Sequence, residues 1–183
     1  MEEAKRVFRI LVPMMAGYGA AIGSFIPSAI IMILLWLYND LGGANAGPLQ
    51  RNVINAVACA CFGWGAYISL YNFGETVNTR LCNWIIVTAA VIMTTTHAQD
   101  LPDMLGNKAR DRKTIHLIYG ERWARATLAI LVPLWSVSCL VFWNIKSPVA
   151  WIPALLLSSI MSLTAVLCRE YSYDEIVWKL LCL

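Results

Sequence analysis

The sequence predicts an all-α fold, a polytopic bundle of transmembrane helices. Of its 183 residues, 59% are hydrophobic and only 14% are charged, whereas a soluble domain carries roughly a quarter charged residues. The apolar residues fall into six runs bounded by polar segments, and a helix suits the bilayer because it satisfies its own backbone hydrogen bonds. We expect a single transmembrane domain over residues 1–183, with about six spans and a C-terminal amphipathic or partial helix.

The first two runs predict a helical hairpin. One covers about residues 7–23 and the other residues 27–38, which is short for a span because crossing takes about 20 apolar residues. Gly23 and Pro27 separate them, since Gly and Pro interrupt helices. The polar, glycine-rich segment 39–48 follows the second run.

The remaining runs predict four further spans and a terminal helix. Each begins or ends beside polar or turn-forming residues, as helix ends do. The fourth span leads directly into a charged segment. The expected helices cover residues 51–71, 81–98, 123–143, 149–167 and, at the C-terminus, 173–183.

The basic residues predict how the helices are oriented in the membrane. In a six-span arrangement every Lys and Arg except Arg80 and Lys146 falls on one side. Basic residues concentrate on the cytosolic side of membrane proteins. We therefore expect a multi-pass integral membrane protein whose loop 99–122 faces the cytosol, in a eukaryotic cell at the endoplasmic reticulum.

One densely charged segment, QDLPDMLGNKARDRKT at residues 99–114, stands out from the apolar sequence. Asp100 and Asp103 are three residues apart and would share one face of a helix, which Pro102 is suited to begin. Carboxylates followed by bases suit a divalent metal and the phosphates that it bridges. The alternative is a solvated cytosolic loop that attracts anionic lipid headgroups.

The run THAQDLPDMLGNKARDRKTIHLIYG resembles the second aspartate-rich motif of the UbiA-type intramembrane prenyltransferases, roughly D-x-x-D-x-E-G-D followed by bases. The segments YNDLGG and RNVINA resemble the fungal branch, which includes prenyltransferases of secondary metabolism and membrane-bound terpene cyclases. The resemblance covers nearly the whole chain and implies a bundle normally of nine helices. Because no first aspartate-rich motif is found, we expect a partial bundle that lacks its N-terminal part.

The resemblance also implies a site that binds Mg²⁺ and an allylic prenyl diphosphate. Asp100 and Asp103 match the first two carboxylates of the motif, so we expect them to be catalytic and to bind the metal. Asn107 stands where a third Asp is usual and would offer its carbonyl oxygen to the metal, while Leu105 replaces a usual Glu. The residues expected to bind the diphosphate are Lys108, Arg110, Arg112 and Lys113.

Three functions remain open at this point. The first is a UbiA-like prenyltransferase of terpenoid biosynthesis, which transfers an isoprenyl group to an acceptor, aromatic in some members. The second is a terpene cyclase of the same fold, which needs no acceptor. The third is a truncated, non-catalytic membrane protein, favoured by the missing first motif and the altered second one.

Overall fold

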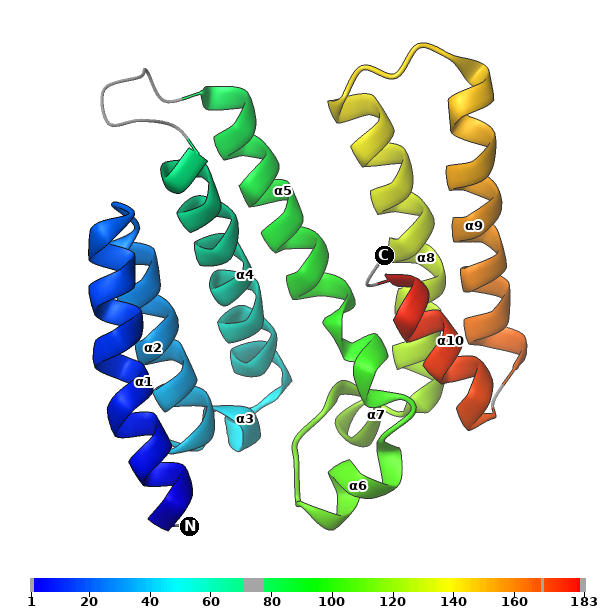
Figure 1. Cartoon of the computed structure of the whole chain (residues 1–183). Coiled ribbons are helices and arrows are strands. Elements are labelled where there is room, and N and C mark those ends of the chain that lie inside the picture. Colours follow the sequence, from blue (N-terminus) through cyan, green and yellow to red (C-terminus); the bar gives the residue numbers. More distant parts are fainter. Residues whose placement is uncertain (1, 71–77, 169, 182–183) are drawn as a thin grey trace. The chain divides into compact units, whose positions relative to one another are not determined.

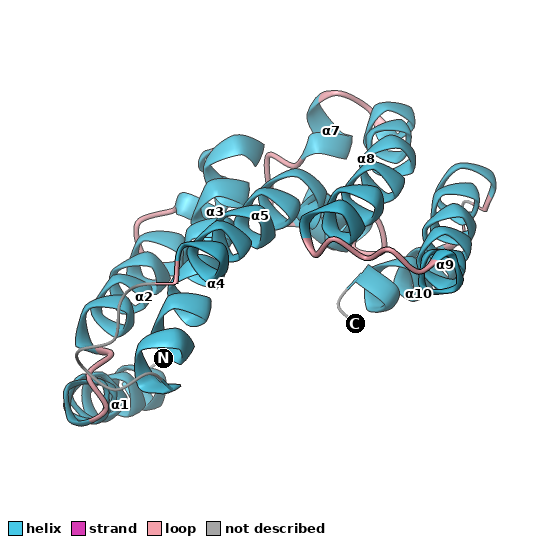
Figure 2. Cartoon of the chain, turned by 90° about the horizontal axis from the view of Figure 1, so that it is seen from above, coloured by secondary structure: helices cyan, strands magenta, loops and turns pink. Residues whose placement is uncertain are grey.

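The computed structural model describes residues 2–70, 78–168 and 170–181. Every regular element among these residues is a helix (Figure 2), which confirms the predicted all-α class. The chain divides into two compact units. The first comprises residues 1–44 and 53–93, and the second residues 45–52 and 94–183.

The first unit contains α1 (Glu2–Ala21), α2 (Phe25–Asn39) and most of α4 (Pro48–Leu70) and α5 (Thr79–Thr95), with the single turn α3 (Gly43–Ala46) before α4 (Figure 1). Gly23 reverses the chain between α1 and α2 with a φ of 76°. Glycine adopts this left-handed conformation without the steric cost of a Cβ. The predicted hairpin is therefore confirmed.

Small residues allow the helices of the first unit to approach closely. A Cβ at Gly19 of α1 would lie 2.8 Å from Oγ of Ser28 on α2, and one at Gly63 of α4 would lie 3.3 Å from Ile85 of α5. Small residues at such contacts are typical of helix packing in membranes. An apolar hollow of about 250 Å³ lies among α1, α2 and α4.

The second unit is built on the antiparallel hairpin of α8 and α9, and α10 folds back against α9 (Figure 1). Three short helices connect α5 to α8. The helices of this unit are η1, a 3₁₀ helix (Thr96–Asp100), α6 (Met104–Ala109), α7 (Ile115–Ile118), α8 (Glu121–Phe142), α9 (Pro148–Leu167) and α10 (Tyr171–Leu181).

The second unit has two small apolar cores. The first, here called the Leu101 core, comprises Ala98, Leu101, Ala124 and Leu128, which are 1–3% exposed. It joins η1 to α8. The second core, of Val132, Met161 and Val177, joins α8, α9 and α10.

Four described helical stretches are long and apolar enough to cross a membrane, and only 17–22% of the residues in their most apolar windows are buried. Large apolar side chains such as Leu134, Leu156 and Ile160 are exposed on these helices. Their exposure to water would be unfavourable, whereas contact with lipid tails is favourable. The apolar stretches of α1 and α2 are shorter. The four stretches are Pro48–Leu70, Thr79–Asp100, Glu121–Phe142 and Pro148–Leu167.

The six predicted spans correspond to α1, α2, α4, α5, α8 and α9. Two predicted ends, at residues 71 and 183, lie outside the described residues. The C-terminal helix α10 begins at Tyr171, two residues before the expected start. It has 11 residues and carries charged side chains such as Asp174 and Lys179. It is therefore shorter and more polar than the spans, as predicted.

Candidate functional site

The charged segment covers the end of η1, a bend and the short helix α6, in place of the expected single helix. Asp100 ends η1, Asp103 occupies the N-cap position of α6, and a bend separates them. Pro102 lies in this bend and has no N–H to continue a helical ladder. The prediction that one helix presents both carboxylates on one face is therefore wrong.

Asp100 lies in a polar group, here called the Asp100 cluster, of the buried residues Arg51, Asp100 and Asn107 and the partly buried Arg112. Nη1 of Arg51 lies 2.5 Å from Oδ1 of Asp100, and Nδ2 of Asn107 donates to the same oxygen at 3.4 Å. Nη1 of Arg112 donates to Oδ1 of Asn107 at 3.4 Å. Arg51, Asp100 and Asn107 are only 5%, 3% and 1% exposed. The ion pair and hydrogen bonds within the cluster therefore take the place of the hydrogen bonds to water that these groups lose on burial.

Asp103 lies apart from this cluster and pairs with Arg110. Nε of Arg110 also donates to the carbonyl oxygen of Gly106 at 3.0 Å. About half of each side chain in the pair is exposed, so solvent screens their attraction. The second expected carboxylate is therefore at the surface, paired with an arginine that is also half-exposed.

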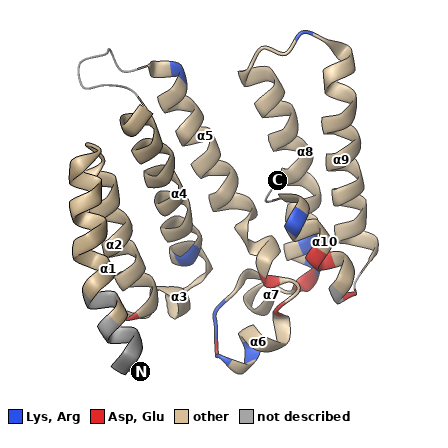
Figure 3. Cartoon of the chain, viewed as in Figure 1, with Lys and Arg blue, Asp and Glu red and all other residues tan. Residues whose placement is uncertain are grey.

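The remaining predicted bases, Lys108 and Lys113, are exposed. Between them Asp111 has a φ of 50°, a left-handed conformation that Asp tolerates better than most residues. Basic segments gather on and after α6 (Figure 3). The structure thus brings together Asp100, Asn107 and Arg112, and separately Asp103 and Arg110.

Two buried histidines lie close in sequence to members of the Asp100 cluster: His97 precedes Asp100 by three residues, and His116 follows Arg112 by four. Nε2 of His97 donates to the carbonyl oxygen of Ala124 at 3.2 Å and lies 3.0 Å from Oγ1 of Thr127, which fastens η1 to α8. His116 lies within hydrogen-bond distance of Thr114, with 3.2 Å between Nδ1 and Oγ1. Burial lowers the pKa of His116 below its ordinary value of 6.5, and although the Asp100 carboxylate opposes this shift, the charge of Arg51 adds to it.

Arg51 is the principal residue of the site that sequence reasoning missed. The sequence pattern places it only among the bases that predict the membrane orientation, although it lies in the first turn of a spanning helix. A charged side chain in a span almost always has a partner. That rule could have indicated a role for Arg51, but it could not identify Asp100, 49 residues away.

Asp100 offers one carboxylate for a Mg²⁺ ion, while Asn107 turns its Nδ2 group toward Asp100 and its Oδ1 toward Arg112. Their side chains are in contact, and Mg²⁺ uses one or two carboxylates together with substrate phosphates in preference to a closed protein cage. In the described part of the chain, no three His, Cys, Asp or Glu side chains gather as a metal-binding group. A Mg²⁺ ion at Asp100 would take most of its ligands from a bound phosphate and from water.

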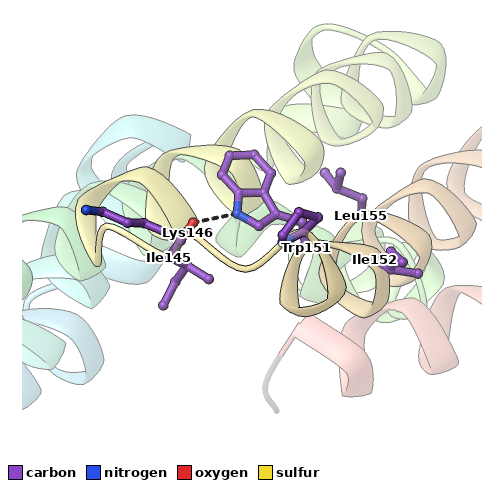
Figure 4. A pocket seen from close by; sticks show the side chains of 6 residues that line it. Ile145, Lys146, Trp151, Ile152 and Leu155 are labelled. Atoms are coloured by element: carbon purple, nitrogen blue, oxygen red, sulfur yellow. Dashed lines mark hydrogen bonds between the residues drawn. The ribbon is translucent and has the colours of Figure 1, made fainter.

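A separate hollow of about 460 Å³ lies at the turn between α8 and α9, lined mainly by apolar side chains (Figure 4). Nε1 of Trp151 donates to the carbonyl oxygen of Ile145 at 2.7 Å and holds one wall in place. Lys146 is the charged residue of the lining, and its ammonium group points away from Ile152 and Leu155 (Figure 4). This hollow contains no carboxylate and lies at the end of α8 away from Glu121.

The chain is similar to known proteins of one family. The model of the UbiA prenyltransferase family matches residues 3–181. The chain is similar to the fumagillin beta-trans-bergamotene synthase of Aspergillus fumigatus, with 28% identity over 173 residues. These residues are 94% of this chain and 57% of that protein. No solved structure matches the chain.

The family match extends over all six predicted spans and over the charged segment between α5 and α8. The chain spans little more than half of the length of its curated relative. Its helical class, its apolar helices of spanning length and the family model agree. This chain is an integral membrane protein that belongs to the UbiA prenyltransferase family.

Proposed function

We propose that this chain forms the diphosphate-binding part of a membrane prenyltransferase, which transfers an isoprenyl group from an allylic prenyl diphosphate to an acceptor. The observation that carries the proposal is the family match, which includes the charged segment. The buried pairing of Asp100 with Arg51 at the end of a spanning stretch supports it. A site at this depth can hold a charged diphosphate while the isoprenoid tail remains in the apolar phase.

The bases of the segment would bind the phosphate oxygens. Arg112 is the best placed, because it already donates to Asn107 beside Asp100. Arg110 would exchange Asp103 for a phosphate oxygen, which is favourable because arginine forms strong paired hydrogen bonds with phosphate. Lys108 and Lys113 would add charge from the exposed side.

Arg51 would orient Asp100, and Asp100 and Asn107 would hold Mg²⁺, with Asp103 contributing once Arg110 has left it. The metal, when bound, supplies Lewis-acid stabilisation of charge on the diphosphate. In the transfer, the allylic C–O bond breaks and its electron pair leaves with the diphosphate. An aromatic acceptor would then form the new C–C bond with its π electrons and lose a proton.

We also propose that the charged segment faces the cytosol and, in a eukaryotic cell, lies at the endoplasmic reticulum membrane. The bias of basic residues supports this orientation. The six apolar helices and the C-terminal helix would form one UbiA-like domain over residues 1–183. The hypothesis of a non-catalytic membrane protein predicts the same orientation and no turnover.

A terpene cyclase is the second candidate, and the similarity to a protein named as a beta-trans-bergamotene synthase favours it. In a cyclase the double bonds of the substrate itself capture the allylic cation. The two activities differ in one requirement. A transferase releases its product only with an acceptor, whereas a cyclase releases a hydrocarbon from the diphosphate alone.

Release of inorganic pyrophosphate by the purified chain in detergent tests the proposal. Prenyl diphosphates of increasing length are supplied with Mg²⁺, with and without aromatic acceptors, and the organic products are identified by mass spectrometry. We expect the Asp100→Asn variant to lose on the order of a hundredfold in rate, since removing a preorganised electrostatic group costs about that much.

Asp111→Asn is the matched control, because it makes the same chemical change at an exposed residue of the same segment. Its φ of 50° suits Asn as well as Asp. We expect its rate to stay within about twofold of the parent, as for surface changes in general. If no prenyl diphosphate is turned over by the parent chain, the catalytic proposal is wrong and the non-catalytic hypothesis is favoured.

A further inference from the structure

We propose that the ion pair of Arg125 and Asp174 clamps α10 against the turn that carries Asp100, which makes these two residues positioning residues for the site. The inference rests on the proposed function only in giving Asp100 a ligand. The positioning itself concerns η1 and α10 and is measurable without any ligand.

The clamp is a buried, two-pronged ion pair. Nη1 and Nη2 of Arg125 on α8 donate to the two carboxylate oxygens of Asp174 on α10 at 2.6 and 2.7 Å. Both side chains are 3% exposed. Two parallel hydrogen bonds between a guanidinium and a carboxylate set both the distance and the orientation of the partners.

Arg125 makes further hydrogen bonds to α8 and α9 beside this ion pair. Its Nε donates to Oε1 of Glu121 at 2.8 Å, and its Nη1 also donates to the carbonyl oxygen of Ala165 on α9 at 2.9 Å. One guanidinium therefore links α8, α9 and α10. Because Arg125 lies within a stretch of spanning length, it would lose its buried carboxylate partner and keep only the carboxylate of Glu121, which is 37% exposed, if α10 moved away.

The docked α10 supports η1 directly. Trp178 and Leu181 of α10 pack against the Leu101 core, whose members Ala98 and Leu101 stand on either side of Asp100 in the chain. The short 3₁₀ helix has poorer hydrogen-bond geometry than an α-helix, so its position depends on what packs against it. On this basis α10 acts as a strap that holds the Asp100 turn in place.

Figure 3 shows acidic and basic segments of α8 and α10 close to each other at the end of the hairpin where η1 and α7 lie. The two neighbouring carboxylates of α10 have different partners. Asp174 pairs with Arg125, whereas Glu175 makes an exposed pair with Lys179 on the same helix, 2.8 Å apart. These neighbouring carboxylates provide a matched comparison.

Amide hydrogen exchange of the purified chain in detergent tests the inference. The reporter is the amide of Leu101, which donates to the carbonyl oxygen of Ala98 at 3.3 Å. In Asp174→Asn we expect its exchange to accelerate at least about tenfold, because removing one partner of a buried ion pair is strongly destabilising. Glu175→Gln should leave the exchange within about twofold, as an exposed pair contributes little.

Two further variants separate the clamp from general damage. Trp178→Ala keeps the ion pair and removes the contact with the Leu101 core, so it should accelerate Leu101 exchange as Asp174→Asn does. The double variant Arg125→Met/Asp174→Leu replaces the charges by apolar side chains, which often restores a buried contact, and should recover the parental exchange. If Asp174→Asn does not fold, the inference is tested by comparing Leu101 exchange in Trp178→Ala with that in the double variant.

The inference is overturned if α10 amides become labile in Asp174→Asn or Trp178→Ala while Leu101 exchange stays parental. A second arm measures the affinity of each variant for a non-hydrolysable prenyl thiodiphosphate. We expect a loss in Asp174→Asn and recovery in the double variant. If the parent chain does not bind the thiodiphosphate but Leu101 exchange responds as expected, the proposed function fails and the positioning stands.

Discussion

At the scale of single residues, the site depends on a buried ion pair. Asp100 is 3% exposed and pairs with Arg51, which is 5% exposed. A buried charge without a partner is expensive, so neither residue is independent of the other. Asn107 adds a neutral donor to the same oxygen, which supports the carboxylate without adding repulsion.

Arg51→Met should destabilise the chain by about 3 kcal/mol, the cost of removing one partner of a buried ion pair. Reversible unfolding in mixed micelles measures the change. The double variant Arg51→Met/Asp100→Leu should recover most of this loss, since no charge then stays buried. Equal stability of the parent and Arg51→Met would contradict a contribution of the ion pair.

The stability of the chain should also depend on the protonation of His116. Its folded pKa lies below the ordinary 6.5, chiefly because the imidazole is buried. Between the folded pKa and about 6.5 the unfolded state binds more protons, so stability is fully present above pH 6.5 and falls as the pH is lowered. Melting curves from pH 8 to pH 5 should show a smaller decline for His116→Gln than for the parent chain.

At the scale of elements, the break between η1 and α6 decides what the charged segment can do. One continuous helix would present Asp100 and Asp103 together, as their spacing suggests. The bend at Pro102 instead leaves Asp100 buried and Asp103 half-exposed. The segment therefore combines a buried carboxylate with a half-exposed ion pair at the surface.

The short elements between α5 and α8 are held mainly by side chains from longer helices. Arg51 comes from α4, the contacts of His97 come from α8, and Trp178 comes from α10. Helices of four to six residues are too short to be stable alone. The geometry of the site thus reflects the packing of the long helices around it.

At the scale of the whole molecule, the distribution of basic residues predicts how the helices are oriented in the membrane. Residues 108 and 146 lie beyond opposite ends of α8, a helix of spanning length. They should therefore face opposite sides of the membrane. The bias of bases predicts that residue 108 is on the cytosolic side.

This orientation can be measured with a membrane-impermeant maleimide on sealed microsomes, in a background without native cysteines. We expect Lys108→Cys to be labelled at once and Lys146→Cys only after the membrane is permeabilised. Labelling of both positions before permeabilisation would show that α8 does not separate them.

The sequence by itself determined the helical class, the order of the apolar helices and the place of the charged segment between the fourth and fifth of them. These properties depend on local features, namely the length of each apolar run and the turn residues that bound it. Only the tertiary structure decided that Asp100 pairs with Arg51 and that Asp174 pairs with Arg125, each 49 residues away. Such partners depend on which helix ends meet in space, and no spacing along the chain specifies that.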